Sequence, residues 1–204
     1  MKLRRRETLA VVSGLAAWLP PAAPAWAQTR TPAQTEGPYY PSRSMRGSDQ
    51  NQDLVKIDGA VREAGGEIIQ LKGRVFAADR SPAAGARVEI WQVDTHGRYL
   101  HTGDSNPAAR DAYFQGFGQA VADARGAFRF RTIKPVPYPG RTPHIHAKVF
   151  HQGRELTTQF YIAGHPLNAQ DSIWRRLGPA GQEAVAMRFR PGADGEETTV
   201  DIYL

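Results

Sequence analysis

Two histidines separated by a single residue are the first side chains in this sequence that could do chemistry together. His144 and His146 flank Ile145 and are followed by Ala147. Because side chains alternate along a β-strand, both imidazoles would point to one face and could bind one metal ion. The alternative is that Ile145 and Ala147 face the core while both histidines face water. The pattern by itself leaves both interpretations open.

Two tyrosines precede this pair in positions where they could join it. Three prolines surround Tyr138 within residues 132–141, so this segment is expected to be an extended, rigid loop with Tyr138 at its tip. Tyr99 follows a strand-like segment at residues 87–93 and a turn. Each tyrosine also has a simpler interpretation. Tyr138 could pack on the prolines, and Tyr99 could be a half-buried loop residue.

Together, residues 87–99, 132–146 and 157–161 resemble the intradiol ring-cleaving dioxygenases, the family of protocatechuate and catechol dioxygenases. The shared order is a tyrosine, then Pro-Tyr-Pro, then an arginine followed by His-Ile-His. The resemblance covers most of the chain from residue 35 to about residue 164. It implies an oxidoreductase that uses O2 to cleave a catecholic ring between its two hydroxyl-bearing carbons. The expected product is a muconate-type diacid.

The resemblance also implies a role for each matching residue. The expected ligands of a non-haem Fe(III) ion are Tyr99, Tyr138, His144 and His146. Tyr99 is expected to stay bound, whereas Tyr138 is expected to leave the metal when substrate arrives. Arg141 and Gln159 are expected to lie beside the bound catechol, and with Tyr138 they form the predicted catalytic set.

These residue types suit ferric iron. A hard, highly charged ion prefers anionic oxygen donors. Tyrosine normally has a pKa near 10, but a bound trivalent ion would ionise it. The chain contains no cysteine, which excludes iron–sulfur clusters and thiolate zinc sites. Arg141 is permanently cationic and is suited to stabilise negative charge that develops during the reaction.

The sequence also departs from the family pattern. Val136, Gly140 and Thr142 stand where the family often has other residues, and these differences predict a reshaped substrate pocket. Residues 35–40 match a family segment near the active site more loosely. We expect no N-terminal helical domain of the kind that catechol-type members carry, so the expected architecture is closer to a protocatechuate-type subunit.

Short strand-like segments separated by turn signals predict the fold that must hold these residues. The expected strands cover residues 68–76, 87–93, 127–132, 144–150, 156–162, 185–189 and 198–204. Ile173, Trp174 and Leu177 lie at helical spacing and predict one short helix within residues 171–178. We therefore expect an all-β fold, a mostly antiparallel β-sandwich at residues 67–204. Strand ends and loops at one end should form the metal site.

The N-terminus predicts an export signal that is cleaved after residue 27. A basic opening precedes an apolar run at residues 9–19, and Ala25-Trp26-Ala27 provides the small residues that a signal peptidase requires. The run is shorter than the roughly 20 residues that span a bilayer, so no membrane attachment is expected after cleavage. Arg5 and Arg6 favour the twin-arginine route, with an ordinary Sec signal as the alternative. The mature protein is then expected to be periplasmic or secreted.

Residues 28–66 are rich in Pro, Gly, Ser and Arg and predict an irregular arm that wraps the domain or a neighbouring copy in a homo-oligomer. The whole chain has a formal net charge of +6. Residues 1–27 carry four basic side chains and one acidic one, so the remainder has a net charge of +3. Because no basic cluster with interleaved aromatic residues is present, nucleic-acid binding is not expected.

Two other functions compete with the dioxygenase interpretation. A transthyretin-like periplasmic binding module would leave the histidine pair exposed and would bind no iron. A copper- or zinc-binding sandwich could use the two histidines alone, and would then keep its metal without Tyr99 and Tyr138. Neither alternative explains the ordered occurrence of two tyrosines, Arg141 and Gln159.

Overall fold

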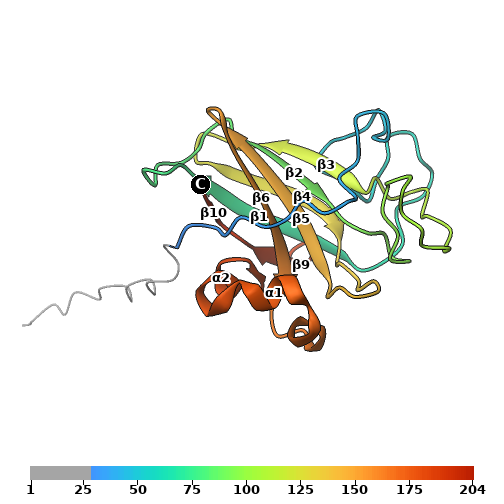
Figure 1. Cartoon of the computed structure of the whole chain (residues 1–204). Helices are drawn as coiled ribbons and strands as arrows, with labels where there is room; N and C mark the ends of the chain where they lie inside the picture. Colours follow the sequence, from blue (N-terminus) through green and yellow to red (C-terminus); the bar gives the residue numbers. More distant parts are fainter. Residues whose placement is uncertain (1–28) are drawn as a thin grey trace, which may run out of the picture.

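Two β-sheets pack face to face in the computed structural model, which describes residues 29–204 (Figure 1). The expected all-β sandwich is therefore confirmed. The predicted export signal at residues 1–27 lies outside the described residues. Within the described part of the chain, no helix is long and apolar enough to cross a membrane.

The first sheet is organised around its longest strand, β1. Its strands are β1 (Ile68–Phe76), β4 (Ala127–Ile133), β8 (Arg190–Gly192), β9 (Gly195–Thr199) and β10 (Ile202–Tyr203). Strand β4 pairs antiparallel with β1, whereas β9 and β10 run parallel to it. The second sheet has the order β3-β2-β5-β6-β7 and is antiparallel except for its last pair. Its strands are β2 (Arg87–Trp91), β3 (Phe117–Val121), β5 (His144–His151), β6 (Arg154–Ile162) and β7 (Ala186–Met187).

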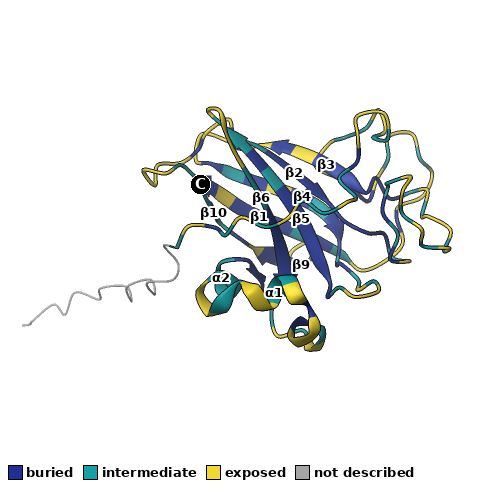
Figure 2. Cartoon of the chain, viewed as in Figure 1, coloured by how far each residue is buried: buried dark blue, intermediate teal, exposed yellow. Residues whose placement is uncertain are grey.

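The main core fills the space between the sheets because inward-facing positions alternate along the strands. In β1 every second residue from Ile69 to Val75 is inward, and three of these positions carry Ile69, Leu71 and Val75, all fully buried. Strand β5 differs, since it is buried at every position from His144 to Ala147. Figure 2 shows this burial along the central strands, while the helices expose their outer surfaces. A strand buried on both faces requires a second cover on the outer face of its sheet.

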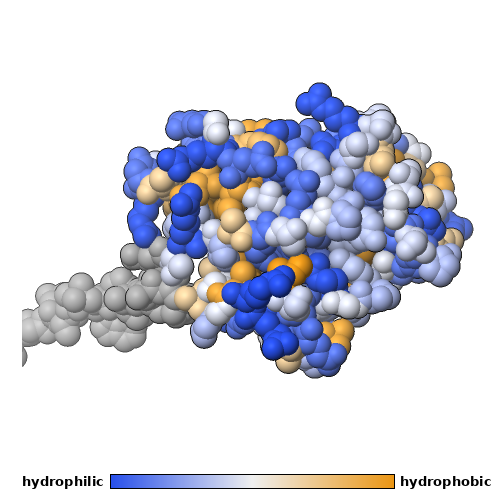
Figure 3. Space-filling model, in the orientation of Figure 1, coloured by the Kyte–Doolittle hydropathy of each residue, from blue (hydrophilic) through white to orange (hydrophobic). Residues whose placement is uncertain are grey.

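The irregular N-terminal arm supplies part of that cover. Gln34 N donates to Thr157 O at 2.8 Å, so the arm runs along the free edge of β6. Its aromatic residues Tyr39 and Tyr40 then pack against a second apolar cluster built around Trp91. The arm thus contacts its own domain, and wrapping around a neighbouring copy stays a prediction. Hydrophilic residues cover most of the face in Figure 3, with a small hydrophobic patch near the C-terminus.

The C-terminal third of the chain differs from the expected elements. Instead of one helix there are a 3-10 helix (Pro166–Gln170), α1 (Ser172–Arg176) and α2 (Gly178–Ala184). The helix expected within residues 171–178 is confirmed as α1, and the 3-10 helix and α2 are additional. Asp171 caps α1, and Pro179 stands in the first turn of α2. The strand expected at residues 185–189 spans only Ala186–Met187. Strand β3 was not expected, because glycines 116 and 118 interrupt its apolar pattern.

The strand expected at residues 198–204 is interrupted at Val200 and Asp201, although its pairing register along β1 stays the same on both sides of the break. Strand β9 pairs with Ile69–Lys72 and β10 with Val75–Phe76. Between them the Asp201 carboxylate accepts the Arg74 N–H at 2.9 Å in place of a backbone carbonyl. Neighbouring atoms leave no room for a side chain at Gly73 of β1. An added Cβ would lie 2.1 Å from Val200 O and 2.7 Å from Phe128 Cζ. Only glycine fits there.

We expect Gly73→Ala to lower the free energy of unfolding by about 1–3 kcal/mol or more, because the backbone carbonyl of Val200 cannot yield without breaking the pairing. The control is Gly47→Ala, whose added Cβ would meet its nearest atom at 3.8 Å. It should change stability by less than about 0.5 kcal/mol. Urea unfolding of the metal-free protein measures both effects, and equal values for the two variants would contradict the steric argument.

Candidate metal centre

Strand β5 places His144 and His146 on the outer face of the second sheet. His146 lies opposite Trp91 of β2 and Gln159 of β6. Its imidazole stacks on the Trp91 indole, with ring centroids 4.6 Å apart and an interplanar angle of 13°. Both histidines are almost completely buried, at 2% and 3% exposure. The interpretation in which they face water is therefore wrong.

A capped turn after β2 fixes the position of Tyr99. The Asp94 carboxylate accepts the backbone N–H groups of His96 and Arg98 at 2.8 and 3.0 Å. The backbone N–H of Tyr99 itself donates to the Asp104 carboxylate at 2.7 Å. The Tyr99 ring is 2% exposed and stacks against Tyr39 of the arm at 4.8 Å. Tyr99 therefore has little freedom to move.

The proline-rich loop holds Tyr138 more loosely. Arg141 N donates to Tyr138 O at 2.9 Å across a tight turn in which Gly140 has a φ of +80°. Tyr138 is half-buried, whereas its neighbours Pro137 and Pro139 are exposed. Its ring meets Tyr99 edge to face at 5.5 Å. The two tyrosines thus differ in how tightly the fold confines them.

The four side chains bring their heteroatoms together in one small volume. Tyr99 Oη lies 3.0 Å from His146 Nε2, 3.3 Å from His144 Nε2 and 3.4 Å from Tyr138 Oη. The two Nε2 atoms are 3.2 Å apart. Within residues 29–204 no group of three or more His, Asp or Glu residues could hold a metal ion, so a site with more than two protein ligands at this cluster would need the tyrosines. All four predicted ligands converge.

Burial keeps the two imidazoles neutral. It lowers the pKa of His144 to about 3, with a further decrease from the nearby Arg141 charge. Burial, with proximity to His144 and Arg141, lowers the pKa of His146 well below its ordinary value. His144 Nδ1 lies 2.7 Å from Thr142 O and donates to it, which leaves the lone pair on Nε2, facing the cluster. Such neutral imidazoles are ready to bind a metal.

The remaining electrostatics describe the cluster in the absence of a cation. Burial raises the pKa of Tyr99 well above its usual value, and the proximity of Tyr138 raises it further. Without a cation the phenol therefore stays protonated. His146 Nδ1 is buried and has no hydrogen-bond partner among the described residues. Two phenols and two neutral imidazoles that converge in this way fit a hard metal ion, which would ionise the phenols and bind the nitrogen lone pairs.

Arg141 and Gln159 lie at the edge of this cluster. Arg141 Nη2 donates to Gln159 Oε1 at 2.6 Å, and Arg141 Nη1 lies 3.4 Å from Tyr138 Oη. The other end of the Gln159 amide donates to Thr35 O at 2.9 Å, which fixes the amide orientation. The structure therefore brings together all six residues that the sequence singled out. It also places residues 35–40 of the arm over the same site.

The other histidines lie outside the cluster. His96 is exposed, and His101, His151 and His165 are half-buried. Two of them contact neighbours of the cluster: the His101 ring lies 5.8 Å from the ring of Tyr39, and His165 Nδ1 lies 3.3 Å from Thr142 Oγ1. Sequence reasoning did not identify Asp171, which contacts Arg141, or Trp91 as the stacking partner of His146. Strand alternation could have suggested Trp91, but no local signal connects Asp171 with Arg141.

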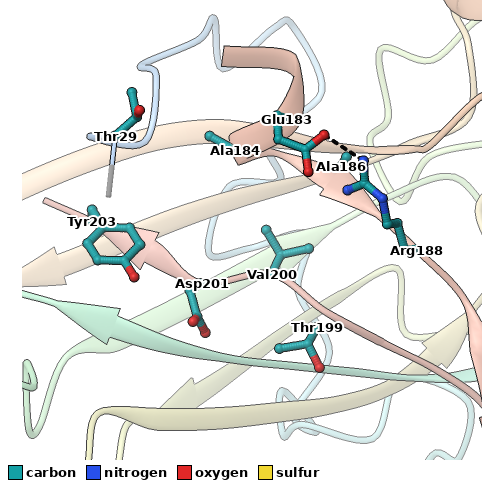
Figure 4. Close-up of a pocket in the computed structure, with 9 residues that line it drawn as sticks. All are labelled: Thr29, Glu183, Ala184, Ala186, Arg188, Thr199, Val200, Asp201 and Tyr203. Carbon is teal, nitrogen blue, oxygen red and sulfur yellow. Dashed lines mark hydrogen bonds and ion pairs between the residues drawn. The ribbon is translucent and has the colours of Figure 1, made fainter. Parts of the chain in front are cut away.

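A separate hollow lies where α2 approaches the ends of β7, β9 and β10. Figure 4 shows its lining, which includes the ion pair between Glu183 and Arg188. Its volume is about 260 Å³. No lining residue belongs to the metal cluster, so this hollow has no part in the chemistry described above.

Comparisons with known proteins agree with this geometry. A family model described as Dioxygenase matches residues 35–204. The protocatechuate 3,4-dioxygenase beta chain of Burkholderia cepacia is 37% identical over 161 residues, which cover 74% of this chain and 68% of that protein. A catechol 1,2-dioxygenase of Acinetobacter baylyi is 30% identical over 163 residues, which cover 71% of this chain and 50% of the relative. The chain thus spans only about half the length of such catechol relatives.

Solved structures show the same similarity. The dioxygenase domain of a dioxygenase carbohydrate-binding protein fusion from Streptomyces sp. SirexAA-E has a TM-score of 0.67 and 35% identity, covering 86% of this chain and 98% of that chain. Catechol 1,2-dioxygenase from Acinetobacter sp. ADP1 has a TM-score of 0.64 and 27% identity, covering 85% and 62%. These matches give no support to the transthyretin-like alternative. The chain belongs to the intradiol ring-cleavage dioxygenases, a family of oxidoreductases.

Proposed function

We propose that this chain is a non-haem Fe(III) dioxygenase that cleaves a catecholic ring with O2 between its hydroxyl-bearing carbons, giving a muconate-type diacid. One observation carries the proposal. Two phenol oxygens and two imidazole nitrogens converge, with each of the other three atoms within 3.4 Å of Tyr99 Oη. Relatives named for protocatechuate and catechol support a catecholic substrate class.

The donor set favours ferric iron over softer or less charged ions. The chain has no cysteine, and the two tyrosines can each provide an anionic oxygen. When bound, Fe(III) supplies the charge that ionises both phenols and binds the two oxygens of a catechol, which activates the ring towards O2. The protein contributes the placement of these donors and the neutrality of both imidazoles.

The unequal confinement of the two tyrosines supports different roles for them. Tyr99 is 2% exposed and packed against Tyr39, so it is suited to remain a ligand. Tyr138 is half-buried in a surface loop, so it can swing away and its phenolate oxygen can take a proton from the incoming catechol. The Arg141 guanidinium, 3.4 Å from Tyr138 Oη, is placed to stabilise negative charge on the oxygens nearby.

We also propose that residues 1–27 are an export signal and that the mature protein is periplasmic or secreted. The basic opening, the apolar run at residues 9–19 and Ala25-Trp26-Ala27 support this proposal. Intact-mass measurement on protein from a periplasmic extract should give a chain that begins at Gln28. Recovery of the uncleaved chain from the cytoplasm alone would contradict the export proposal without affecting the proposed chemistry.

The visible absorption spectrum tests the metal and its ligands. We expect the iron-loaded protein to show a broad tyrosinate-to-iron charge-transfer band that shifts when catechol or protocatechuate is added without oxygen. Tyr99→Phe should abolish or strongly weaken this band because it removes the confined phenolate. The control is Tyr203→Phe, since Tyr203 stacks on Phe76 and takes no part in the cluster. A protein that stays colourless after iron loading overturns the proposal, and copper or zinc retained without Tyr99 would favour the histidine-only site.

The buried histidines predict how the stability of the metal-free protein depends on pH. The folded-state pKa of His144 is about 3, and that of His146 is also depressed, whereas both are near 6.5 when unfolded. Below pH 6.5 the unfolded chain therefore binds protons that the folded protein does not. Stability should fall as pH decreases from 6.5 towards 3, by up to about 1.4 kcal/mol per pH unit for each histidine.

Urea unfolding at several pH values measures this dependence. The matched variant is His146→Gln, which keeps a buried polar side chain but removes one titrating group. Its stability should decline less steeply with decreasing pH than that of the wild type. Parallel curves for the two proteins would show that His146 does not contribute in the way its burial implies.

A further inference from the structure

Asp171 lies between the 3-10 helix and α1 and is buried, with 1% exposure. Its carboxylate accepts four hydrogen bonds. Oδ1 accepts the backbone N–H groups of Ile173 and Trp174 at 2.8 and 3.1 Å, and Oδ2 accepts Arg141 Nε–H and Thr142 N–H at 2.8 and 3.1 Å. One oxygen therefore caps α1, and the other holds the loop that precedes the two histidines.

The pair formed by Arg141 and Asp171 is largely removed from water. The Asp171 side chain is 0% exposed and that of Arg141 is 16% exposed. Burial opposes ionisation of Asp171, but hydrogen bonds from Arg141 and the Trp174 backbone outweigh it and lower the pKa of the carboxyl group. Breaking such a pair from one side leaves an uncompensated buried charge. The guanidinium therefore cannot leave Asp171 easily.

Two fixed contacts leave the guanidinium a single orientation. Asp171 holds Nε and Gln159 holds Nη2, so Nη1 is the group turned towards Tyr138 Oη. A planar guanidinium held at two of its three nitrogens cannot rotate to present a different edge. The direction of its charge relative to the metal cluster then depends on a carboxylate that lies 30 residues further along the chain.

We propose that Asp171 is a positioning residue for ring cleavage, because it orients the Arg141 guanidinium towards the oxygens bound at the metal centre. This inference rests on the proposed function. Asp171 forms no hydrogen bond with any of the four proposed metal ligands. It reaches the site through Arg141 and, more indirectly, through Thr142, whose carbonyl accepts the His144 Nδ1–H. Only the contact with Arg141 orients a charged group towards the cluster. Because electrostatic stabilisation depends on preorganised donors, a guanidinium that is free to turn loses much of its benefit.

Asp171→Asn separates positioning from helix capping. Asparagine is a good N-cap, so its side-chain oxygen can still accept the N–H groups of Ile173 and Trp174. Its amide NH2 then faces Arg141 Nε–H, and two donors cannot bond. We expect kcat per bound iron to fall roughly 10- to 100-fold with a much smaller change in KM. The charge-transfer band of the resting enzyme and of its anaerobic catechol complex should persist, while the decay of that complex on mixing with O2 should slow in parallel with kcat.

A double-variant cycle with Arg141→Gln distinguishes positioning from a purely structural role. If Asp171 acts through Arg141, adding Asp171→Asn to Arg141→Gln should lower kcat by less than about twofold. The double variant should also melt at a higher temperature than Arg141→Gln alone, because it removes the buried carboxylate that has lost its cation. Multiplicative losses in kcat, or an Asp171→Asn enzyme with wild-type kcat per iron, would overturn the proposal.

Two further variants keep the result interpretable. Asp123→Asn is the control, since Asp123 caps an exposed turn through the N–H groups of Arg125 and Ala127, and it should leave kcat unchanged. Asp171→Ser replaces Asp171→Asn if the latter does not fold, because serine can cap α1 but is too short to reach Arg141.

A wild-type protein without the iron band or O2 uptake would mean that the proposed function fails. An active wild type with an unaffected Asp171→Asn variant would mean that only this inference fails.

Discussion

The burial of β5 on both of its faces is the constraint on which the rest of the structure depends. Ile145 and Ala147 of this strand belong to the core between the sheets, so alternation turns His144 and His146 to the outer face. If water could reach these imidazoles, protons would compete with a metal ion for the nitrogen lone pairs, and water would compete with the imidazoles for the ion. The outer face therefore needs its own cover, which the N-terminal arm and the loops after β2 and β4 supply.

That cover also determines the electrostatics of the site. Removing water lowers the pKa of both histidines and raises that of Tyr99, so these three side chains are neutral in the absence of a cation. The other three donor atoms lie 3.0–3.4 Å from Tyr99 Oη. A highly charged ion among these donors would be stabilised strongly, because the buried surroundings screen charge poorly. Arg141 is a fixed positive charge beside the cluster, and its partner Asp171 compensates for it. A permanent cation so close to a metal would otherwise oppose binding.

The same fold makes the two tyrosines unequal. Tyr99 follows a capped turn, belongs to the second apolar cluster and stacks on Tyr39 of the arm, whereas Tyr138 stands on a loop in which Pro137 and Pro139 face solvent. Rigidity of the proline loop and exposure of its tip are compatible, because proline restricts the backbone and leaves the tyrosine side chain free. In the proposed site, which would both retain a metal and admit a substrate, the confined phenol suits the first task and the looser one the second.

The sequence by itself determined the ligand types, their order along the chain and the strand that carries His144 and His146, because alternation and proline stiffness are local properties. It also determined the sandwich class, because short strands that alternate apolar and polar residues can bury their apolar faces in only a few architectures. Only the tertiary structure decided that four donors from three segments meet, that the arm covers them and that Asp171 holds Arg141. Those features depend on sheet order and strand register, which bring together residues 30 to more than 100 positions apart and which no local pattern encodes. The break between β9 and β10 and the extra helical turns were likewise decided by side-chain contacts, since the Asp201 carboxylate replaces a backbone acceptor beside Arg74 and the Asp171 carboxylate caps α1.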